Sequence, residues 1–291
     1  MAQASDYKNV YYVPHGSYWP IVGSVGLFLL AGGGAMALNS HAIGPWIAIL
    51  GVATLLVMIF GWFRDVINES VAGLYNAQVD RTYRWAMGWF IFSEVMFFGA
   101  FFGALFYART LAVTWLGGEG AKSLTGAVLW PDFAATWPTA GPAELGGEFI
   151  AMGAWGLPAI NTAILLTSSW TLAVAHHALK DGEQQRVINW LVATIALGVI
   201  FLGLQAYEYV HAYQDLNLTL ATGIYGSTFF MLTGFHGLHV TLGAIMLGAV
   251  LYRVLKGHMT SERHFVFEAG AWYWHFVDVV WLGLFIFVYI L

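Results

Sequence analysis

The chain has 291 residues, of which 59% are hydrophobic and 9% charged, against about 45–50% and about 25% in a typical soluble domain. It has a formal net charge of −5 and no cysteine, which excludes disulfides, thiolate metal sites and iron–sulfur clusters. No basic cluster suggests nucleic-acid binding. We therefore interpret the chain as an integral membrane protein. Its polar and aromatic start has no basic region leading into a short apolar core, so we expect no removable signal peptide.

A membrane-spanning helix needs roughly 20 mostly apolar residues. On that criterion the sequence predicts seven helices, at 19–38, 43–63, 83–106, 157–179, 188–209, 222–255 and 265–291. No repeat and no long hydrophilic block indicates a second domain. The predicted fold is an all-α membrane bundle forming one domain over 1–291, with helices 1–2 in 1–70 and helices 3–7 in 71–291.

The basic residues predict an orientation for this bundle. If the helices alternate in direction, all but two of the 11 Lys and Arg fall on one side, namely Lys8, Arg64, Arg81, Arg84, Lys180, Arg186, Arg253, Lys256 and Arg263. Only Arg109 and Lys122 fall on the other side. The positive-inside rule then places the N-terminus in the cytoplasm and the C-terminus in the periplasm.

The longest connection between the predicted helices runs over 107–156. It is rich in Gly, Pro and Trp and carries Glu119, Asp132, Glu144 and Glu148. Loops of this length are usually functional or form contact surfaces. We expect an ordered cap on the outer surface, without chemistry of its own.

Glu94 is a carboxyl group in the middle of the third predicted helix, roughly 16 Å deep at about 1.5 Å per residue. At that depth it is either neutral or paired. It is therefore either part of a proton or ion relay or a structural carboxyl bonded to a neighbouring helix. Gly99 and Gly103 follow on the same helix and favour the close approach of another helix.

The last predicted helix carries Glu268, His275 and Asp278 in an otherwise apolar segment. At helical spacing these residues share a face with Trp272. Ionisable groups in a membrane are expensive unless they face protein or water. The sequence thus predicts that this face is a structural polar seam inside the bundle, and that the opposite face, with its Val, Phe and Trp, contacts lipid.

The ten histidines raise the question of haem or copper binding, because membrane enzymes bind these metals through imidazole. His236 and His239 are three residues apart and share a face, whereas His176 and His177 are adjacent and point about 100° apart. Neither pair comes with an acidic ligand pattern such as Glu-x-x-His. We predict no metal in this chain and assign His236 and His239 to the polar seam, as helix–helix hydrogen bonds.

A further set of polar and aromatic residues falls at the predicted inner interface. Cations beside an aromatic ring at headgroup depth can hold a lipid phosphate, although Arg and Lys at helix ends also reach the interface without a specific lipid. The candidate lipid-binding residues are Trp62, Glu69, Arg84, Arg253, Lys256, His258 and Thr260.

The sequence resembles subunit III of cytochrome c oxidase in stretches that touch all seven predicted helices. These stretches are Trp19-Pro20, Trp62 with Arg64-Asp65-Val66-Ile67, 90–98 around Glu94, Ala175-His176-His177, Glu208-Tyr209, 225–230, 233–240 and 267–282.

The resemblance implies a non-catalytic subunit of the haem–copper oxidase complex, which passes electrons from cytochrome c to dioxygen and pumps protons. It implies that the first two helices are separated from the other five by a V-shaped cleft filled with phospholipids, near the candidate lipid-binding residues. Haem and copper would lie in subunits I and II, with subunit I as the main contact and no redox cofactor in this chain. Glu94 would be a functional carboxyl that tunes proton uptake or lipid contact, and no residue would be catalytic.

The sequence also departs from the mitochondrial pattern of that family. Asn68 stands where an Arg is usual, Leu74-Tyr75-Asn76 replaces a His-His turn, and the loop 107–156 is longer. The longer loop suggests a bacterial protein of the inner, cytoplasmic membrane, and the replaced residues suggest one altered phosphate anchor.

Two alternative functions stay open. One is the related subunit of a quinol oxidase or nitric oxide reductase, against which Trp19-Pro20 and Arg64-Asp65 favour the cytochrome c enzyme. The other is a self-contained proton-coupled transporter with Glu94, Glu268 and Asp278 as its relay. No broken-helix pair or internal repeat supports the transporter.

Overall fold

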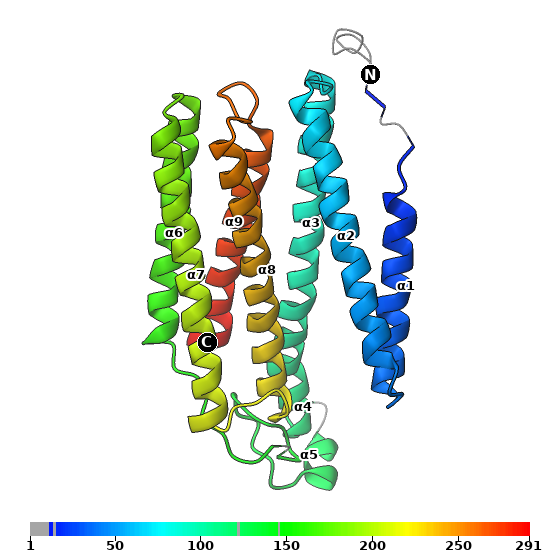
Figure 1. Cartoon of the computed structure of the whole chain (residues 1–291). Coiled ribbons are helices and arrows are strands. Elements are labelled where there is room, and N and C mark those ends of the chain that lie inside the picture. The colour runs from blue at the N-terminus through cyan, green and yellow to red at the C-terminus, as the bar shows by residue number, and fades with distance from the viewer. Residues whose placement is uncertain (1–11, 14–15, 121–122, 145) are drawn as a thin grey trace. The chain divides into compact units, whose positions relative to one another are not determined.

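The computed structural model describes residues 12–13, 16–120, 123–144 and 146–291; Lys8 and Lys122 lie outside this part. The described residues form helices and no strands (Figure 1). Among them, seven helical spans are long and apolar enough to cross a membrane. The predicted all-α class and the predicted number of spanning helices are confirmed.

The helices have the following bounds: α1 Trp19–Leu38, α2 Gly44–Val71, α3 Ala77–Tyr107, η2 Ala108–Ala112, α4 Val113–Leu116, α5 Ser123–Leu129, α6 Leu157–Lys180, α7 Gln184–Asp215, α8 Gly223–Leu255, α9 Phe265–Leu284 and η4 Phe285–Ile290. The two η elements are π-helical continuations of α3 and α9. α2 continues to Val71 instead of ending at residue 63, because a run of apolar residues can end while the helical backbone continues into water.

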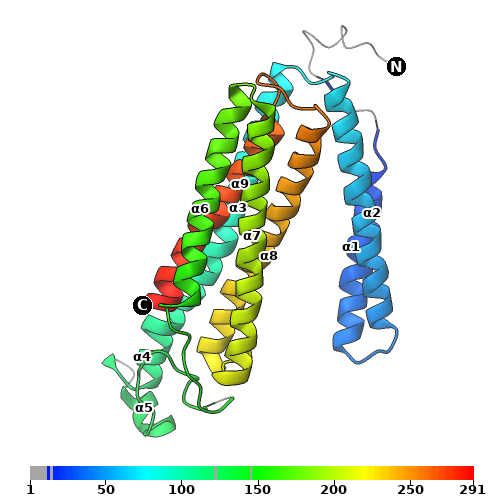
Figure 2. The same ribbon diagram turned by 60° about the vertical axis from the view of Figure 1, so that its left-hand side comes forward.

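The contacts divide the chain into two compact units, Met1–Trp85 and Ala86–Leu291, so that α3 begins in the first and continues in the second. In the first unit, α1 and α2 pack together as a hairpin (Figure 2). A Cβ atom added at Gly33, Gly44 or Gly51 would overlap the backbone of the opposite helix, so glycine permits this close approach. The indole Nε1 of Trp19 on α1 also donates to Asp65 Oδ2 on α2 at 2.8 Å.

In the second unit, the indole of Trp274 on α9 fills a space that glycines leave open. A Cβ added at Gly198 of α7 or Gly243 of α8 would lie 2.5 or 2.9 Å from the nearest indole carbon. The Nε1 of Trp274 donates to Ser168 Oγ on α6 at 2.9 Å. One side chain thus connects α9 with three other helices.

The prediction that the Val, Phe and Trp side of α9 contacts lipid is wrong. Phe267, Trp274 and Trp281 are fully buried, whereas Trp272 and Val279, beside the polar residues, are 38% and 66% exposed. The aromatic face packs inward because small residues of neighbouring helices make room for it and hydroxyl groups accept its N–H bonds. The Nε1 of Trp281, for example, donates to Thr162 Oγ1 on α6 at 2.9 Å.

The loop 117–156 packs on the ends of α7 and α8. The N–H of Ile150 donates to the carbonyl of Leu216 at 2.9 Å, just after α7. The ring of Phe149 stacks on Tyr225 at the start of α8, with centroids 5.4 Å apart. The described part of this loop is an ordered cap, with an open pocket of about 670 Å³ in it.

The second unit has two chemically different ends. The α6–α7 and α8–α9 connections lie at one end and the loop 117–156 lies at the other (Figures 1 and 2). The end without the cap carries Lys180, Arg186, Arg253, Lys256 and Arg263. This matches the charge asymmetry from which the orientation is predicted; the orientation itself stays a prediction.

Candidate functional site

Glu94 on α3 pairs with His239 on α8. The Glu94 Oε2 lies 2.8 Å from the His239 Nε2. The two side chains are 20% and 10% exposed, so both are mostly enclosed by protein. The sequence predicts that Glu94 is neutral or paired, and the structure supplies a partner from a neighbouring helix.

The other ring nitrogen of His239 determines what this pair can do. Its Nδ1 lies 2.6 Å from the carbonyl oxygen of Phe235. A carbonyl oxygen only accepts hydrogen bonds, so Nδ1 carries a hydrogen. The contact with Glu94 then needs one further proton, held either by the carboxyl group or by Nε2. Moving it across 2.8 Å converts a neutral pair into an ion pair without changing the net charge.

Aromatic rings surround the pair. The rings of Phe98 and Phe97 lie 4.9 and 5.6 Å from the imidazole of His239, centroid to centroid, and the ring of Tyr273 stacks on it at 6.4 Å. Such surroundings lower the local dielectric constant and strengthen electrostatic interactions. The arrangement suits a group that holds or passes one proton.

Other residues of the predicted polar seam connect neighbouring helices. The His236 Nε2 on α8 lies 3.2 Å from the carbonyl oxygen of Val277 on α9. The His275 Nδ1 on α9 contacts the Ser169 hydroxyl on α6, and Asp278 is buried on the same helix. These positions suit a structural seam; that role stays a prediction.

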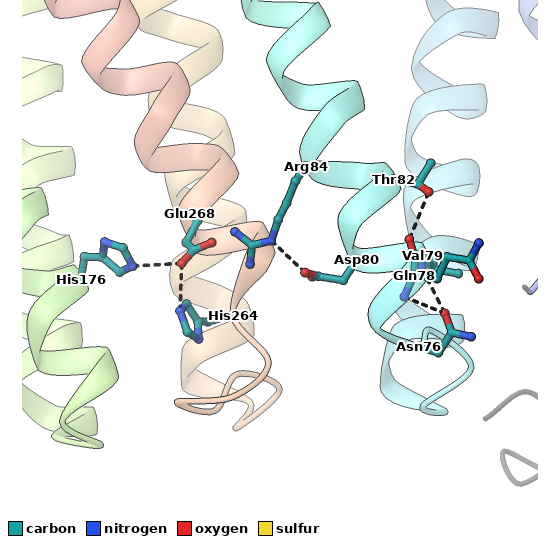
Figure 3. Close-up of polar contacts among 9 residues, drawn as sticks. All are labelled: Asn76, Gln78, Val79, Asp80, Thr82, Arg84, His176, His264 and Glu268. Atoms are coloured by element: carbon teal, nitrogen blue, oxygen red, sulfur yellow. Dashed lines mark hydrogen bonds and ion pairs between the residues drawn. The ribbon is translucent and has the colours of Figure 1, made fainter. Parts of the chain in front are cut away.

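Glu268 lies apart from His275 and Asp278, at the start of α9. Its Oε1 is 3.1 Å from the Nε2 of His264 and 3.6 Å from the Nε2 of His176 on α6 (Figure 3). His264 is the residue that the sequence analysis missed. Its signal is the spacing of four residues from Glu268, since side chains four apart lie on one face of a helix.

The segment Leu74-Tyr75-Asn76, which connects α2 to α3, has two local roles. The Asn76 Oδ1 accepts hydrogen bonds from two backbone N–H groups in the first turn of α3, at 3.1 and 3.0 Å (Figure 3), which caps that helix. The Tyr75 hydroxyl donates to Glu69 Oε2 at 2.7 Å. Burial raises the pKa of Tyr75, with further contributions from Tyr83 and Glu69, so the hydroxyl stays a donor.

The candidate lipid-binding residues are divided between the two units. The first unit holds Trp62, Glu69 and Arg84, and the second holds the other four. The Trp62 side chain is exposed. The Arg84 Nε donates to Asp80 Oδ2 at 2.8 Å, one turn earlier on α3.

In the second unit, Thr260 shapes the connection between α8 and α9. Its Oγ1 accepts from the backbone N–H of Arg263 at 3.1 Å, and its carbonyl oxygen lies 3.2 Å from the Nδ1 of His264. Arg253 is buried in the last turn of α8, and the Lys256 ammonium lies 5.6 Å from the centroid of a tyrosine ring. Lipid binding by these residues stays a prediction.

Seven apolar helical spans and an enclosed carboxyl–imidazole pair define a multi-pass membrane protein with a candidate proton site. The family described as cytochrome c oxidase subunit III matches the chain over residues 9–291. The chain is 40% identical over 282 residues to the cytochrome c oxidase subunit 3 of Formosania lacustris, of Cyprinus carpio and of Gadus morhua, with 97% of this chain and 97% of each relative covered. The chain belongs to the cytochrome c oxidase subunit III family, which confirms the resemblance seen in its motifs.

Proposed function

We propose that this chain is the non-catalytic subunit III of a membrane complex that passes electrons from cytochrome c to dioxygen and pumps protons. The observation that carries the proposal is the family match over residues 9–291, with relatives of the same name at 40% identity. In this proposal the haem and copper centres belong to subunits I and II. This chain supports them and holds no redox centre.

Subunit I is the proposed main partner, with subunit II as the second. The glycine face of α3 supports contact with another subunit, because a Cβ added at Gly99 or Gly103 would have no atom of another described helix within 4 Å. We place the complex in the inner membrane of a bacterium, on the ground of the long loop 107–156. Phospholipids held near Trp62 and Arg253 would give apolar dioxygen a path towards subunit I.

Glu94 is the proposed functional carboxyl of this subunit. Together with His239 it can hold one proton in two positions 2.8 Å apart, in aromatic surroundings that exclude most water. A pair of this kind can respond to a charge nearby or pass a proton to a neighbouring group. It would thereby support proton uptake by the catalytic subunit and protect that subunit during turnover.

Purification in mild detergent tests the assignment. We expect the chain to co-purify with haem-bearing subunits, giving the visible spectrum of a haem–copper oxidase, and with a subunit II that has a dinuclear-copper Cys/His motif. A complex with a subunit II that lacks this motif would indicate the quinol oxidase relative. An isolated chain that transports protons without haem-bearing partners would refute the proposal.

A further inference from the structure

Three polar side chains converge at the uncapped end of the second unit, where α6 finishes and α9 begins. His176 lies in the last turns of α6, His264 directly precedes α9, and Glu268 lies in the first turn of α9. Figure 3 shows the three side chains pointing towards one another. The Nε2 atoms of the two histidines and a carboxylate oxygen all lie within 4.8 Å of one another.

The hydrogen bond of His264 to the backbone determines its protonation pattern. Its Nδ1 lies 3.2 Å from the carbonyl oxygen of Thr260, which can only accept, so Nδ1 carries a hydrogen. In the neutral ring, Nε2 then presents a lone pair to a Glu268 oxygen that is 3.1 Å away and also an acceptor. A positively charged species must lie between these two atoms, either a proton or a metal ion.

His176 separates these two possibilities. Its Nε2 is buried, has no hydrogen-bond partner among the described residues, and lies 3.6 Å from the same Glu268 oxygen. With only a proton between His264 and Glu268, this nitrogen stays 3.6 Å from the carboxylate, longer than an ordinary hydrogen bond. A metal ion at the centre of the group would bond to all three residues.

The two distances to the Glu268 oxygen fit a tetrahedral ion. For metal–ligand bonds of about 2.0–2.1 Å, two ligand atoms of a tetrahedron lie about 3.3–3.5 Å apart. The two distances to Glu268 are 3.1 and 3.6 Å, on either side of that value. Two imidazoles and one carboxylate suit zinc with water as a fourth ligand, whereas Ca²⁺ and Mg²⁺ prefer six or more oxygens.

We propose that His176, His264 and Glu268 form a binding site for a divalent transition-metal ion of the zinc type. This departs from the prediction that the chain holds no metal, and it does not depend on the proposed function.

The surroundings are those of an organised site. The backbone bond from His264 to Thr260 is the type of outer contact that fixes the tautomer of a metal-binding histidine. The ring of Phe267 stacks on His176 with centroids 5.5 Å apart, which restricts rotation of that imidazole. The three side chains are 12–24% exposed, so an ion can enter from the water at this end. A bound ion would join α6 to α9 and to the connection that carries Thr260.

Zinc binding by the purified membrane complex containing the full chain tests the proposal. The complex is treated with a chelator, dialysed against zinc chloride, and its bound zinc measured by elemental mass spectrometry. We expect the variants His264→Gln and Glu268→Gln to bind one zinc fewer per complex than the wild type, or to bind it more than about 10-fold more weakly. His177→Asn, an exposed histidine beside His176 and outside the group, is the matched control and should bind zinc like the wild type.

If the variants fail to assemble, a measurement on the wild-type protein still tests the proposal. Diethyl pyrocarbonate modifies accessible imidazoles, and peptide mass spectrometry locates the modified residues. We expect zinc chloride to protect His176 and His264 and to leave the modification of His177 unchanged. Two results would overturn the proposal and leave only a His264–Glu268 ion pair. One is equal zinc binding by the wild type and both variants. The other is modification of His176 and His264 that zinc does not change.

Discussion

Replacing Glu94 by Gln and by Ala separates a proton-sharing role from a structural one. The amide of Glu94→Gln can donate to the Nε2 of neutral His239 as a protonated carboxyl does, but it has no proton to release. Glu94→Ala removes the partner altogether. If the shared proton matters, both variants should alter turnover or turnover-linked inactivation, while the haem spectra stay intact. If only the hydrogen bond matters, Glu94→Gln should behave like the wild type.

The two substitutions should also differ in stability. Glu94→Ala leaves the His239 Nε2 without its partner, and an unsatisfied buried polar group costs about 1–3 kcal/mol. The side chains are 20% and 10% exposed, so water offsets part of this cost and we expect about 1–2 kcal/mol, or about 5–30-fold in an equilibrium constant. Glu94→Gln keeps a neutral hydrogen bond and should cost less than about 1 kcal/mol.

The assay uses the purified complex in three measurements: turnover with saturating cytochrome c, the time course of inactivation during turnover, and the temperature at which the chain dissociates. Glu119→Gln, which changes an exposed carboxyl in the loop 117–156, is the control and should leave all three unchanged. Wild-type turnover and durability in both Glu94 variants would refute the functional role of this carboxyl.

Two further predictions concern the stability of the helices: one tests their packing and the other tests the cap of α3. Gly198→Ala places a methyl group 2.5 Å from the indole of Trp274. We expect this overpacking to cost about 1–3 kcal/mol, seen as a lower dissociation temperature. Gly203→Ala, whose methyl group would have no atom of another described helix within 4 Å, should have no such effect. Asn76→Ala removes the cap of α3 and should cost about 1 kcal/mol in the same measurement, whereas Asn76→Asp should keep most of the stability. Equal dissociation temperatures for Asn76→Ala and Asn76→Asp would contradict the capping role.

Most of the fold can be predicted from the sequence because a membrane-spanning helix must be long and apolar. The first predicted helix, 19–38, coincides with α1, and every other predicted span has its helix. The end of α2 at Val71 could not be predicted in this way, because most residues from 64 to 71 are polar and hydropathy says nothing about whether a polar segment stays helical.

The neighbours of each helix are harder to predict. The burial of Trp274 depends on Gly198 and Gly243, which belong to two other helices, and a glycine in sequence does not tell which side chain will fill the space beside it. Hydrophobicity cannot replace this information, since an indole is apolar enough for lipid or for a protein interior. The inward-facing aromatic side of α9 was therefore missed.

The candidate site shows the same division between local and distant information. A mid-helix carboxyl such as Glu94 is conspicuous in a sequence, and its need for a partner follows from the cost of burying charge. The partner, His239, is 145 residues away and is one of ten histidines, so only the fold identifies it. His264 and Glu268 are four residues apart and could have been found together, but His176 joins them only because α6 ends beside the start of α9.

The two carboxyl–imidazole pairs, at Glu94 and at Glu268, differ in one respect that decides their chemistry. In both, a backbone carbonyl holds the hydrogen on Nδ1, so that Nε2 faces a carboxylate oxygen. At Glu94 a single proton satisfies both atoms, and aromatic rings enclose His239. At Glu268 a second imidazole faces the same oxygen at 3.6 Å without a hydrogen bond of ordinary length, so that three ligand atoms converge where the Glu94 pair has two. Glu94→Gln should therefore bind as much zinc as the wild type under conditions in which Glu268→Gln binds one zinc fewer; an equal loss of zinc in both variants would mean that zinc recognises any His–Glu contact in this chain.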